Sequence, residues 1–384
     1  MNQHILSATP PMGWNSWNTF FKHPNEELVC QIADAFVQEG LLEAGYKYLI
    51  IDVGWAMRER DEKGQLVPDP QAFPNGIQPV IDYVHSKGLK FGLYSCCGAL
   101  TCARYPGSLE HEFSDAAQFA AWGVDYLKYD NCLRPASIPS SILYRRMSAA
   151  LRGCGREILF AACQWGTEDV YQWIRSTGAH TFRSTIDIQD CWNSIETIAL
   201  SQMDKQPFGG MGCFNDMDML VVGMYGKGTN PEACMGGCSD TEYQTHFALW
   251  AMMNSPLIIG CDIRSMNSRT KEILTNPDLI AINQDAECRA PCRIDCVGNP
   301  DAFVLVRPLC GGDYAIGFFN FSDTKSDVSL TLWDIGLSAA SGHALEVYDC
   351  IMHEHLGRYK EILLPVLPPH GCAVYRCKII GGSK

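Results

Sequence analysis

The sequence predicts an N-terminal (β/α)8 barrel followed by a C-terminal antiparallel β-sandwich. The chain has 384 residues, more than the ~250–300 at which a single hydrophobic core stops growing, so two domains are expected. Up to about residue 285 short apolar strands alternate with helical patterns, and after about Arg293 the helical patterns cease. We therefore place the barrel at residues 1–292 and the sandwich at residues 293–384.

The first region contains eight predicted strands, at residues 11–17, 46–55, 89–96, 125–130, 157–163, 181–185, 209–216 and 256–262. The segments between them carry helical periodicity. In residues 25–42, for example, Leu28, Ile32 and Phe36 share one stripe that follows a candidate N-cap, Asn25. Residues 77–87 end in a Lys-Gly helix stop before the next strand. Strand–helix alternation repeated in this way implies parallel pairing and a closed barrel.

The second region contains short predicted strands separated by Gly, Asp and Ser turns, at residues 302–309, 314–321, 328–335, 344–348, 362–366 and 370–377. No long helical pattern separates them. Consecutive short strands joined by tight turns are typical of an antiparallel β-sandwich.

The composition limits the classes of partner. Hydrophobic residues make up 47% of the chain and charged residues 19%, as in an ordinary globular protein. The formal charge of −13 argues against nucleic acid or an anionic membrane as a partner. No apolar run reaches the ~18 residues of a membrane span. The N-terminal stretch lacks the basic and apolar segments of a signal peptide, so we expect a cytoplasmic protein with reduced cysteines.

No metal or cofactor is expected from the sequence. Cys288, Cys292 and Cys296 are spaced by four residues, but their segment contains a proline and no histidine. Zinc sites usually show CxxC pairs or Cys/His sets, so structural zinc is the less favoured interpretation. No GxGxxG motif follows a strand. The scattered histidines lack ligand spacing and are expected to serve structure: His85, His111 and His180.

The stretch DYLKYDNC, residues 125–132, ends a predicted strand with two charged side chains. Alternation places Lys128 and Asp130 on the same side of that strand. The ammonium group would lower the pKa of Asp130 and keep it ionised. An ionised aspartate held in a pocket can act as a nucleophile. The alternative is a surface Lys–Asp pair that caps the strand.

The other predicted strands also end in polar and aromatic side chains, which a barrel would gather at the carboxyl rim where barrel active sites form. The set is Trp14, Trp17, Asp52, Trp55, Tyr94, Lys128, Asp130, Cys163, Gln164, Trp165, Arg183, Asp187, Asp216, Asp218 and Asp262. Carboxylates bind sugar hydroxyls, and indole faces stack on pyranose rings. The alternative, an aspartate that caps the following helix, is kept for Asp216 and Asp262.

Six motifs in order resemble those of the α-galactosidase family, glycoside hydrolase family 27: MGWNSW, YLIIDVGW, GLYS with TCARYPGS, DYLKYDNC, FRSTIDIQDCW and FNDMDMLVVG. The similarity runs from about Pro10 to Ile294, and the C-terminal β-domain fits it too. It implies a retaining double displacement with Asp130 as nucleophile and Asp187 as general acid/base. Such carboxylates lie ~5–5.5 Å apart, and the pKa of the acid/base is expected to exceed that of the nucleophile.

The resemblance also implies a set of sugar-binding positions, namely Trp17, Asp52, Tyr94, Lys128, Arg183 and Asp218, with Gln164 and Trp165 in the strand-five motif. Cys102 and Cys132 match a pair that lines the pocket and is bridged in secreted members. Whether they are bridged in this chain stays open at this point.

Two departures from the family pattern concern the substrate. The family usually has two adjacent aspartates after strand two, whereas this chain has Asp52 and Val53. Asp52 keeps the O4 position and Val53 replaces the acceptor for the O6 hydroxyl. Val53 would suit a β-L-arabinopyranoside, which is an α-D-galactopyranoside without its hydroxymethyl group. Gln164 replaces the usual glutamate, and it could still bond O2.

Several readings remain open from the sequence. A retaining exo-glycosidase would act on α-D-galactosides, on β-L-arabinopyranosides or on both, and N-acetylgalactosamine is disfavoured. A catalytically silent sugar-binding protein and a galactosyl transferase are the alternatives on the same scaffold. The expected partner is a small molecule or oligosaccharide with a terminal galactose-like sugar. Homo-oligomerisation is open.

Overall fold

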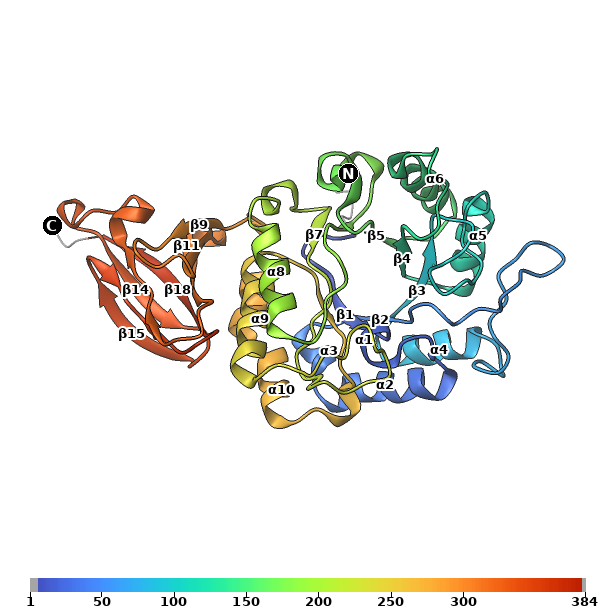
Figure 1. The fold of residues 1–384 in the computed structure, drawn as a ribbon, viewed down its shortest axis with the longest axis horizontal. Coiled ribbons are helices and arrows are strands. Elements are labelled where there is room, and N and C mark those ends of the chain that lie inside the picture. The colour runs from blue at the N-terminus through green and yellow to red at the C-terminus, as the bar shows by residue number, and fades with distance from the viewer. Residues whose placement is uncertain (1–5, 382–384) are drawn as a thin grey trace.

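The computed structural model describes residues 6–381. Residues 1–5, part of the stretch interpreted as lacking a signal peptide, and residues 382–384 lie outside the described residues. A barrel and a β-sandwich stand side by side, with helices α8 and α9 between them (Figure 1). The predicted fold class is confirmed.

The barrel contains an eight-stranded parallel sheet in the order β7-β6-β5-β4-β3-β2-β1-β8. Its strands are β1 Met12–Asn15, β2 Tyr48–Ile50, β3 Lys90–Cys96, β4 Tyr126–Asp130, β5 Leu159–Cys163, β6 Thr181–Arg183, β7 Phe214–Asp216 and β8 Leu257–Ile259. Leu220, just beyond β7, completes the ring: its N–H donates to Ile258 O at 2.7 Å and its carbonyl accepts from Gly260 N at 2.9 Å. Each strand falls within its predicted segment.

Helices surround this sheet and bury a continuous apolar layer against it. They are α1 Trp17–Phe20, α2 Glu26–Gln38, α3 Leu41–Ala44, α4 Gln78–Ser86, α5 Glu112–Trp122, α6 Ser140–Gly153, α7 Val170–Trp173, α8 Trp192–Gln202, α9 Asp240–Met252, α10 Ser268–Leu274 and α11 Pro277–Asn283. Asn25 is the predicted N-cap, since its side chain accepts from Leu28 N at 2.9 Å. The helix expected over residues 25–42 is divided, because Gly40 adopts a left-handed conformation with φ +74°.

The C-terminal domain is built on a six-stranded antiparallel sheet in the order β15-β14-β18-β11-β10-β9. Two strand pairs, β12 with β17 and β13 with β16, form the second layer. The strands are β9 Cys292–Asp295, β10 Ala302–Pro308, β11 Asp313–Asn320, β12 Ser326–Asp327, β13 Leu330–Thr331, β14 Ala344–Asp349, β15 Glu354–Tyr359, β16 Ile362–Leu363, β17 Val366–Leu367 and β18 Cys372–Ile380.

The strands of this domain differ from the prediction at several points. The strand expected over residues 328–335 is a strand only at β13, because a capping box between Thr331 and Asp334 turns the chain into the 3₁₀ helix Leu332–Ile335. Strands β9, β12 and β15 were not predicted, and the strand expected over residues 362–366 is divided into β16 and β17, which pair with different strands. Strand β15 lies at the sheet edge with few buried side chains, so it lacks the apolar alternation that marks a strand in sequence.

The two domains meet through polar as well as apolar contacts. Arg307 of β10 is fully buried and donates to Ala251 O at 3.1 Å and to Asn254 Oδ1 at 2.9 Å, at the end of α9. Near β18, the ring of His370 stacks on Trp192 of α8 with centroids 4.4 Å apart. These contacts fix the sandwich against the α8–α9 side of the barrel.

Within residues 6–381, no helix is both long and apolar enough to cross a membrane. In the same part of the chain, no three or more His, Cys, Asp or Glu side chains are arranged to hold a metal ion.

Candidate active site

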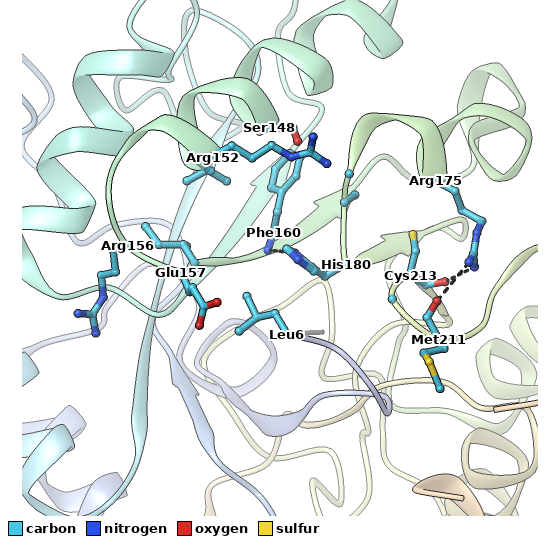
Figure 2. A pocket seen from close by; sticks show the side chains of 15 residues that line it. Leu6, Ser148, Arg152, Arg156, Glu157, Phe160, Arg175, His180, Met211 and Cys213 are labelled. Atoms are coloured by element: carbon cyan, nitrogen blue, oxygen red, sulfur yellow. Dashed lines mark hydrogen bonds between the residues drawn. The ribbon is translucent and has the colours of Figure 1, made fainter. Parts of the chain in front are cut away.

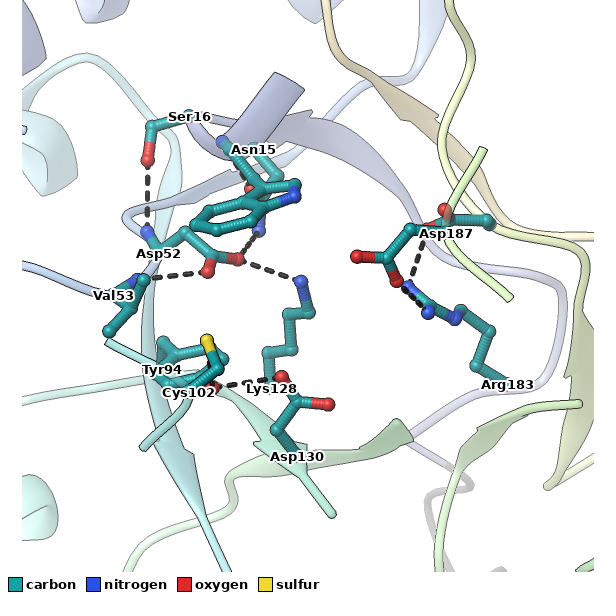
Figure 3. Close-up of polar contacts among 12 residues, drawn as sticks. Asn15, Ser16, Asp52, Val53, Tyr94, Cys102, Lys128, Asp130, Arg183 and Asp187 are labelled. Carbon is teal, nitrogen blue, oxygen red and sulfur yellow. Dashed lines mark hydrogen bonds and ion pairs between the residues drawn. The ribbon is translucent and has the colours of Figure 1, made fainter. Parts of the chain in front are cut away.

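The carboxyl ends of three barrel strands, and the loop after one of them, bring charged side chains to one space (Figure 3). Asp52 follows β2, Lys128 and Asp130 lie on β4, Arg183 ends β6, and Asp187 is in the next loop. Figure 3 shows the carboxylates of Asp130 and Asp187 facing this space from different sides, with Lys128 between Asp52 and Asp130. The acidic residues proposed from sequence therefore converge.

Alternation along β4 selects which side chains reach this space. Lys128 and Asp130 face inward, whereas Leu127 and Tyr129 are fully buried in the layer between sheet and helices. Asp130 is only 7% exposed. The alternative of a surface Lys–Asp pair is therefore wrong.

Lys128 does not pair with Asp130 as the sequence suggested. Its Nζ lies 2.8 Å from Asp52 Oδ2, and Asn15 Nδ2 donates to the same oxygen at 3.0 Å. The other carboxylate oxygen of Asp52 accepts from Val53 N at 2.9 Å. Asp52 is thus a fixed, charge-compensated acceptor in the wall of the site.

Asp130 is held by a phenol instead of an ammonium group. Tyr94 donates its hydroxyl to Asp130 Oδ2 at 2.8 Å. Burial raises the pKa of Asp130, and the charges of Lys128 and Arg183 only partly oppose the shift. The expectation of a lowered pKa was wrong because it counted the nearby cation and neglected desolvation.

Arg183 joins the two remaining carboxylates. Its guanidinium is buried, forms an ion pair with Asp187 and donates to Asp218 Oδ1 at 2.9 Å. Asp218 also accepts from Ile188 N at 2.7 Å. Since Ile188 follows Asp187 directly, Asp218 and Arg183 together position the loop that carries Asp187.

Asp187 lies at the mouth of the site, with 51% of its side chain exposed. Although partial burial acts to raise it, the Arg183 guanidinium holds the pKa of Asp187 below its ordinary value. The sequence predicted the reverse order for the two carboxyl groups, with the pKa of Asp187 above that of Asp130. Burial raises the pKa of Asp130, and the ion pair with Arg183 lowers that of Asp187.

A cavity of about 550 Å³, whose lining residues Figure 2 shows, lies at the amino end of the barrel strands, away from the carboxylates described above. Its walls come from residues that precede β5, β6 and β7, among them Arg152, Glu157 and His180. His180 accepts from Phe160 N at 2.9 Å through Nδ1, and burial lowers its pKa to about 4. None of the carboxylates of Figure 3 lines this cavity.

Comparison with known proteins agrees with the motifs. The family model described as alpha galactosidase A matches residues 9–285, and the alpha galactosidase C-terminal beta sandwich domain matches residues 300–377. An α-galactosidase from Cyamopsis tetragonoloba is 41% identical over 371 residues, which cover 96% of this chain and 86% of that protein. The chain belongs to the α-galactosidase family.

Two solved structures superpose on the whole chain. An α-galactosidase from Saccharomyces cerevisiae, determined with raffinose, superposes with a TM-score of 0.87 at 29% identity, covering 98% of both chains. A β-L-arabinopyranosidase of glycoside hydrolase family 27 from Geobacillus stearothermophilus also gives 0.87, at 23% identity and 100% coverage of both chains. The second likeness shows the shared fold alone.

Against the α-galactosidase pattern, Val53 gives the site an apolar side. It is 1% exposed and belongs to a buried cluster with Trp17, Tyr94 and Ala103. Beside it, the backbone N–H of Trp17 donates to Asn15 Oδ1 at 2.8 Å. The wall next to Asp52 is therefore hydrophobic.

Gln164 is not brought to this space. It is fully buried, and its amide donates to Thr167 Oγ1 at 2.5 Å and to Ser140 Oγ at 3.4 Å, at the start of α6. Alternation along β5 explains this, since Cys163 faces inward with Lys128 and Arg183 and its neighbour must face outward. Cys163, which the sequence places at the carboxyl rim but not among the sugar-binding positions, is thus the residue of this motif that faces the site.

The remaining predicted positions lie at the rim. Trp165 is half-buried and starts a loop with φ +65°. Cys102 and Cys132 are unbridged thiols that interact, since their hydrogen bond lowers the pKa of Cys102 and raises that of Cys132. Cys132 Sγ is 3.4 Å from the hydroxyl of Tyr94.

The helix-cap alternative holds for one of its two aspartates. Asp262 accepts from Arg264 N at 3.1 Å and caps a short 3₁₀ helix, Ile263–Ser265. Asp216 caps no helix: it accepts from Asp218 N at 2.9 Å and lines the barrel interior. Asp216 therefore belongs with the charged groups of the α-galactosidase site.

Proposed function

We propose that this protein is a retaining exo-glycosidase that removes terminal, non-reducing α-galactosyl groups. Membership of the α-galactosidase family supports the substrate class. The convergence of Asp130 and Asp187 on one space, with Asp52 and Lys128 in its wall, supports the chemistry and is the observation that carries the proposal. Raffinose, present in the yeast relative's structure, is a suitable natural test substrate.

The first step is the formation of a glycosyl ester. Asp130 attacks the anomeric carbon, the bond from that carbon to the glycosidic oxygen breaks, and Asp187 gives its proton to the departing oxygen. In the second step Asp187 takes a proton from water, the resulting oxygen nucleophile attacks the anomeric carbon, and Asp130 departs as a carboxylate. The two inversions give net retention.

The surroundings of the two carboxylates suit these roles. Asp130 is buried and immobilised by Tyr94, as a nucleophile aimed at one carbon requires. Asp187 is exposed at the mouth, where a leaving group of variable structure must depart. Because Arg183 favours the ionised form of Asp187, activity should be greatest at acid pH.

Azide rescue tests both assignments. Asp130→Asn should abolish turnover of p-nitrophenyl α-D-galactoside, whereas Asp130→Ala with azide should give the β-galactosyl azide by single inversion. Asp187→Ala should keep the first step for this activated leaving group, and azide should then give the α-azide. Azide products of the opposite stereochemistry would contradict the assignment of Asp130 as nucleophile and Asp187 as general acid/base. Full activity of Asp130→Asn would contradict the role of Asp130.

For the sugar itself, we propose that β-L-arabinopyranosides are also accepted. The hydrophobic wall at Val53 gives no acceptor for an O6 hydroxyl and would fit a sugar that lacks the hydroxymethyl group. Leaving that hydroxyl buried and unpaired costs ~1–3 kcal/mol. The deciding measurement is kcat/KM on p-nitrophenyl β-L-arabinopyranoside relative to the α-D-galactoside. A ratio below about one in a thousand would exclude the second activity.

We also propose a reducing compartment such as the cytoplasm. All 19 cysteines are unbridged in the structure, and the pair that the family resemblance marks for bridging, Cys102 and Cys132, is included. Long-lived thiols are typical of reducing compartments. Fractionation of the source cells, with detection by antibody, would test the location.

A further inference from the structure

Asp190 is a fully buried carboxyl group in the loop that carries Asp187, and it has no role in the mechanism above. This loop, residues 184–191, joins β6 to α8. Only Ile188 and Gln189 separate Asp190 from Asp187. Burial of a charged side chain is costly unless the group is hydrogen-bonded, so the partners of Asp190 indicate what holds this loop in place.

Asp190 ties its own loop to the long loop between β7 and α9 and to α9 itself. One carboxylate oxygen accepts from Gly226 N at 2.7 Å, and the other accepts from the hydroxyl of Tyr243 at 2.7 Å. The backbone of Asp190 pairs with the same long loop: its N–H donates to Ala233 O at 2.8 Å, and its carbonyl accepts from Gly237 N at 2.9 Å. Side-chain and backbone hydrogen bonds therefore meet at this one residue.

Tyr243 of α9 extends this network. Its side chain is fully buried, and its oxygen accepts from Tyr225 N at 2.7 Å and from Cys238 N at 3.2 Å. Because both lone pairs are engaged, the hydroxyl can only donate a further hydrogen bond, and it donates to Asp190. The network therefore requires an acceptor at position 190 toward both Tyr243 and Gly226.

The loop has two other supports close to Asp187. One is the ion pair between Asp187 and Arg183, and the other is the hydrogen bond from Ile188 N to Asp218 at 2.7 Å. A general acid must carry a proton before it reacts. Protonation of Asp187 removes one of the two charges of the ion pair and so weakens it. When Asp187 is ready to donate, the position of the loop therefore depends on its remaining contacts.

We propose that Asp190 is a positioning residue that keeps Asp187 directed at the glycosidic oxygen once its ion pair with Arg183 has weakened. This inference rests on the proposed role of Asp187 as general acid. Asp190 acts through the two residues between them, by holding the loop against the β7–α9 connection. Misplacement of a reacting group by 1 Å can cost ~100-fold in rate, so a loosened loop would impair proton transfer from Asp187 more than attack by Asp130.

The test is the dependence of kcat/KM on the leaving group in Asp190→Asn. An asparagine amide has one acceptor and one donor group, so it must direct a donor at either Gly226 N or the Tyr243 hydroxyl and loses that hydrogen bond. The substrates are phenyl and p-nitrophenyl α-D-galactoside, whose leaving groups have similar shapes. Departure of phenol needs the proton of Asp187, whereas p-nitrophenolate is a more stable anion and departs largely without it.

General acid catalysis contributes ~10²–10⁴-fold, so we expect kcat/KM of Asp190→Asn to fall at least about tenfold further on the phenyl galactoside than on the p-nitrophenyl galactoside. Arg307→Met is the matched control, because it also loses buried hydrogen bonds but lies at the contact with the sandwich, and it should not separate the two substrates. Tyr243→Phe keeps the carboxylate and its bond from Gly226 N. It should show the same separation, and it decides if Asp190→Asn does not fold.

An equal loss on both substrates in Asp190→Asn, or no loss on either, would show a purely structural role and overturn the proposal. Asp187→Ala distinguishes this failure from failure of the proposed function. If Asp187→Ala separates the two substrates and Asp190→Asn does not, only the positioning role is wrong. If Asp187→Ala does not separate them, the assignment of the general acid is wrong, and the positioning role falls with it.

Discussion

Replacement of Val53 by aspartate isolates the cause of sugar preference. Val53 is 1% exposed and follows Asp52 directly, and its N–H already donates to the Asp52 carboxylate. Val53→Asp therefore places a second carboxylate beside the first without any change of the backbone donor. The nearby cation, Lys128, is already engaged by Asp52 at 2.8 Å.

This arrangement gives the variant a cost and a gain. An uncompensated buried charge costs ~3–5 kcal/mol of stability, so the unliganded variant should melt at a clearly lower temperature. In a galactoside complex the new carboxylate accepts the O6 hydroxyl, and a hydrogen bond to a charged group contributes ~1.5–3 kcal/mol. At 1.4 kcal/mol per tenfold, the galactoside should gain roughly 10–150-fold relative to the arabinopyranoside.

The assay is the ratio of kcat/KM values for the two p-nitrophenyl glycosides, measured for wild type, Val53→Asp and Val53→Ala. Val53→Ala is the matched control, because it makes room for a hydroxymethyl group and adds no acceptor. We expect the ratio to move strongly in Val53→Asp and only slightly in Val53→Ala. Equal shifts of the ratio in both variants would show that the sugar preference depends on the volume of the side chain at position 53. An unchanged ratio in Val53→Asp would refute the reasoning.

Three further predictions concern the site and its support. Arg183→Lys keeps one positive charge but cannot serve two carboxylates, so the pKa of Asp187 should rise and the alkaline limb of kcat/KM should move to higher pH; a pH profile that superposes on wild type would contradict this. Arg307→Met leaves the buried Asn254 Oδ1 unpaired, at ~1–3 kcal/mol, and removes one of the two donors to Ala251 O, so calorimetry should show a lower Tm with unchanged kcat/KM. Alkylation of denatured, unreduced protein should label 19 thiols by mass, and 17 would show one bridge.

The sequence was sufficient for the fold because the barrel strands are short, apolar and regularly separated by helical patterns. Local rules also worked at the ends of elements, as at Asn25, whose side chain caps α2. They failed for β15, because an edge strand with few buried side chains has no apolar alternation to detect. The 3₁₀ turn after β13 was missed because its cap at Thr331 competes with strand extension over only four residues.

Within the site, sequence reasoning found which residues converge but not which of them pair. Lys128 and Asp130 are two apart on one strand, about 6.6 Å along the chain. Asp52 follows β2, which β3 separates from β4, and the long Lys128 side chain nevertheless reaches its carboxylate at 2.8 Å. Backbone spacing alone therefore does not decide which charged side chains pair. The structure also places Gln164 away from the site. The family motif indicates its residue type, whereas the alternation of side chains along β5 determines the direction in which it points.

The pairing has a consequence for the proposed nucleophile. Asp52 and Asp187 each have an ion pair, with Lys128 and Arg183. Asp130 accepts hydrogen bonds from the Tyr94 phenol and from Asn131 N at 3.3 Å, and among the ion pairs seen in residues 6–381 it has none. Its ionised form is therefore the least stabilised of the three, in agreement with the raised pKa that burial gives it. When Asp130 bonds to the anomeric carbon, its charge is neutralised, so the cost of burial is relieved as the transition state forms. A cation placed directly against Asp130 would stabilise the free carboxylate more than the transition state and would slow the reaction. Tyr94→Phe should accordingly raise the pKa of Asp130 further and move the acid limb of kcat/KM to higher pH, and an acid limb that stays in place or moves down would show that the phenol does not stabilise the carboxylate.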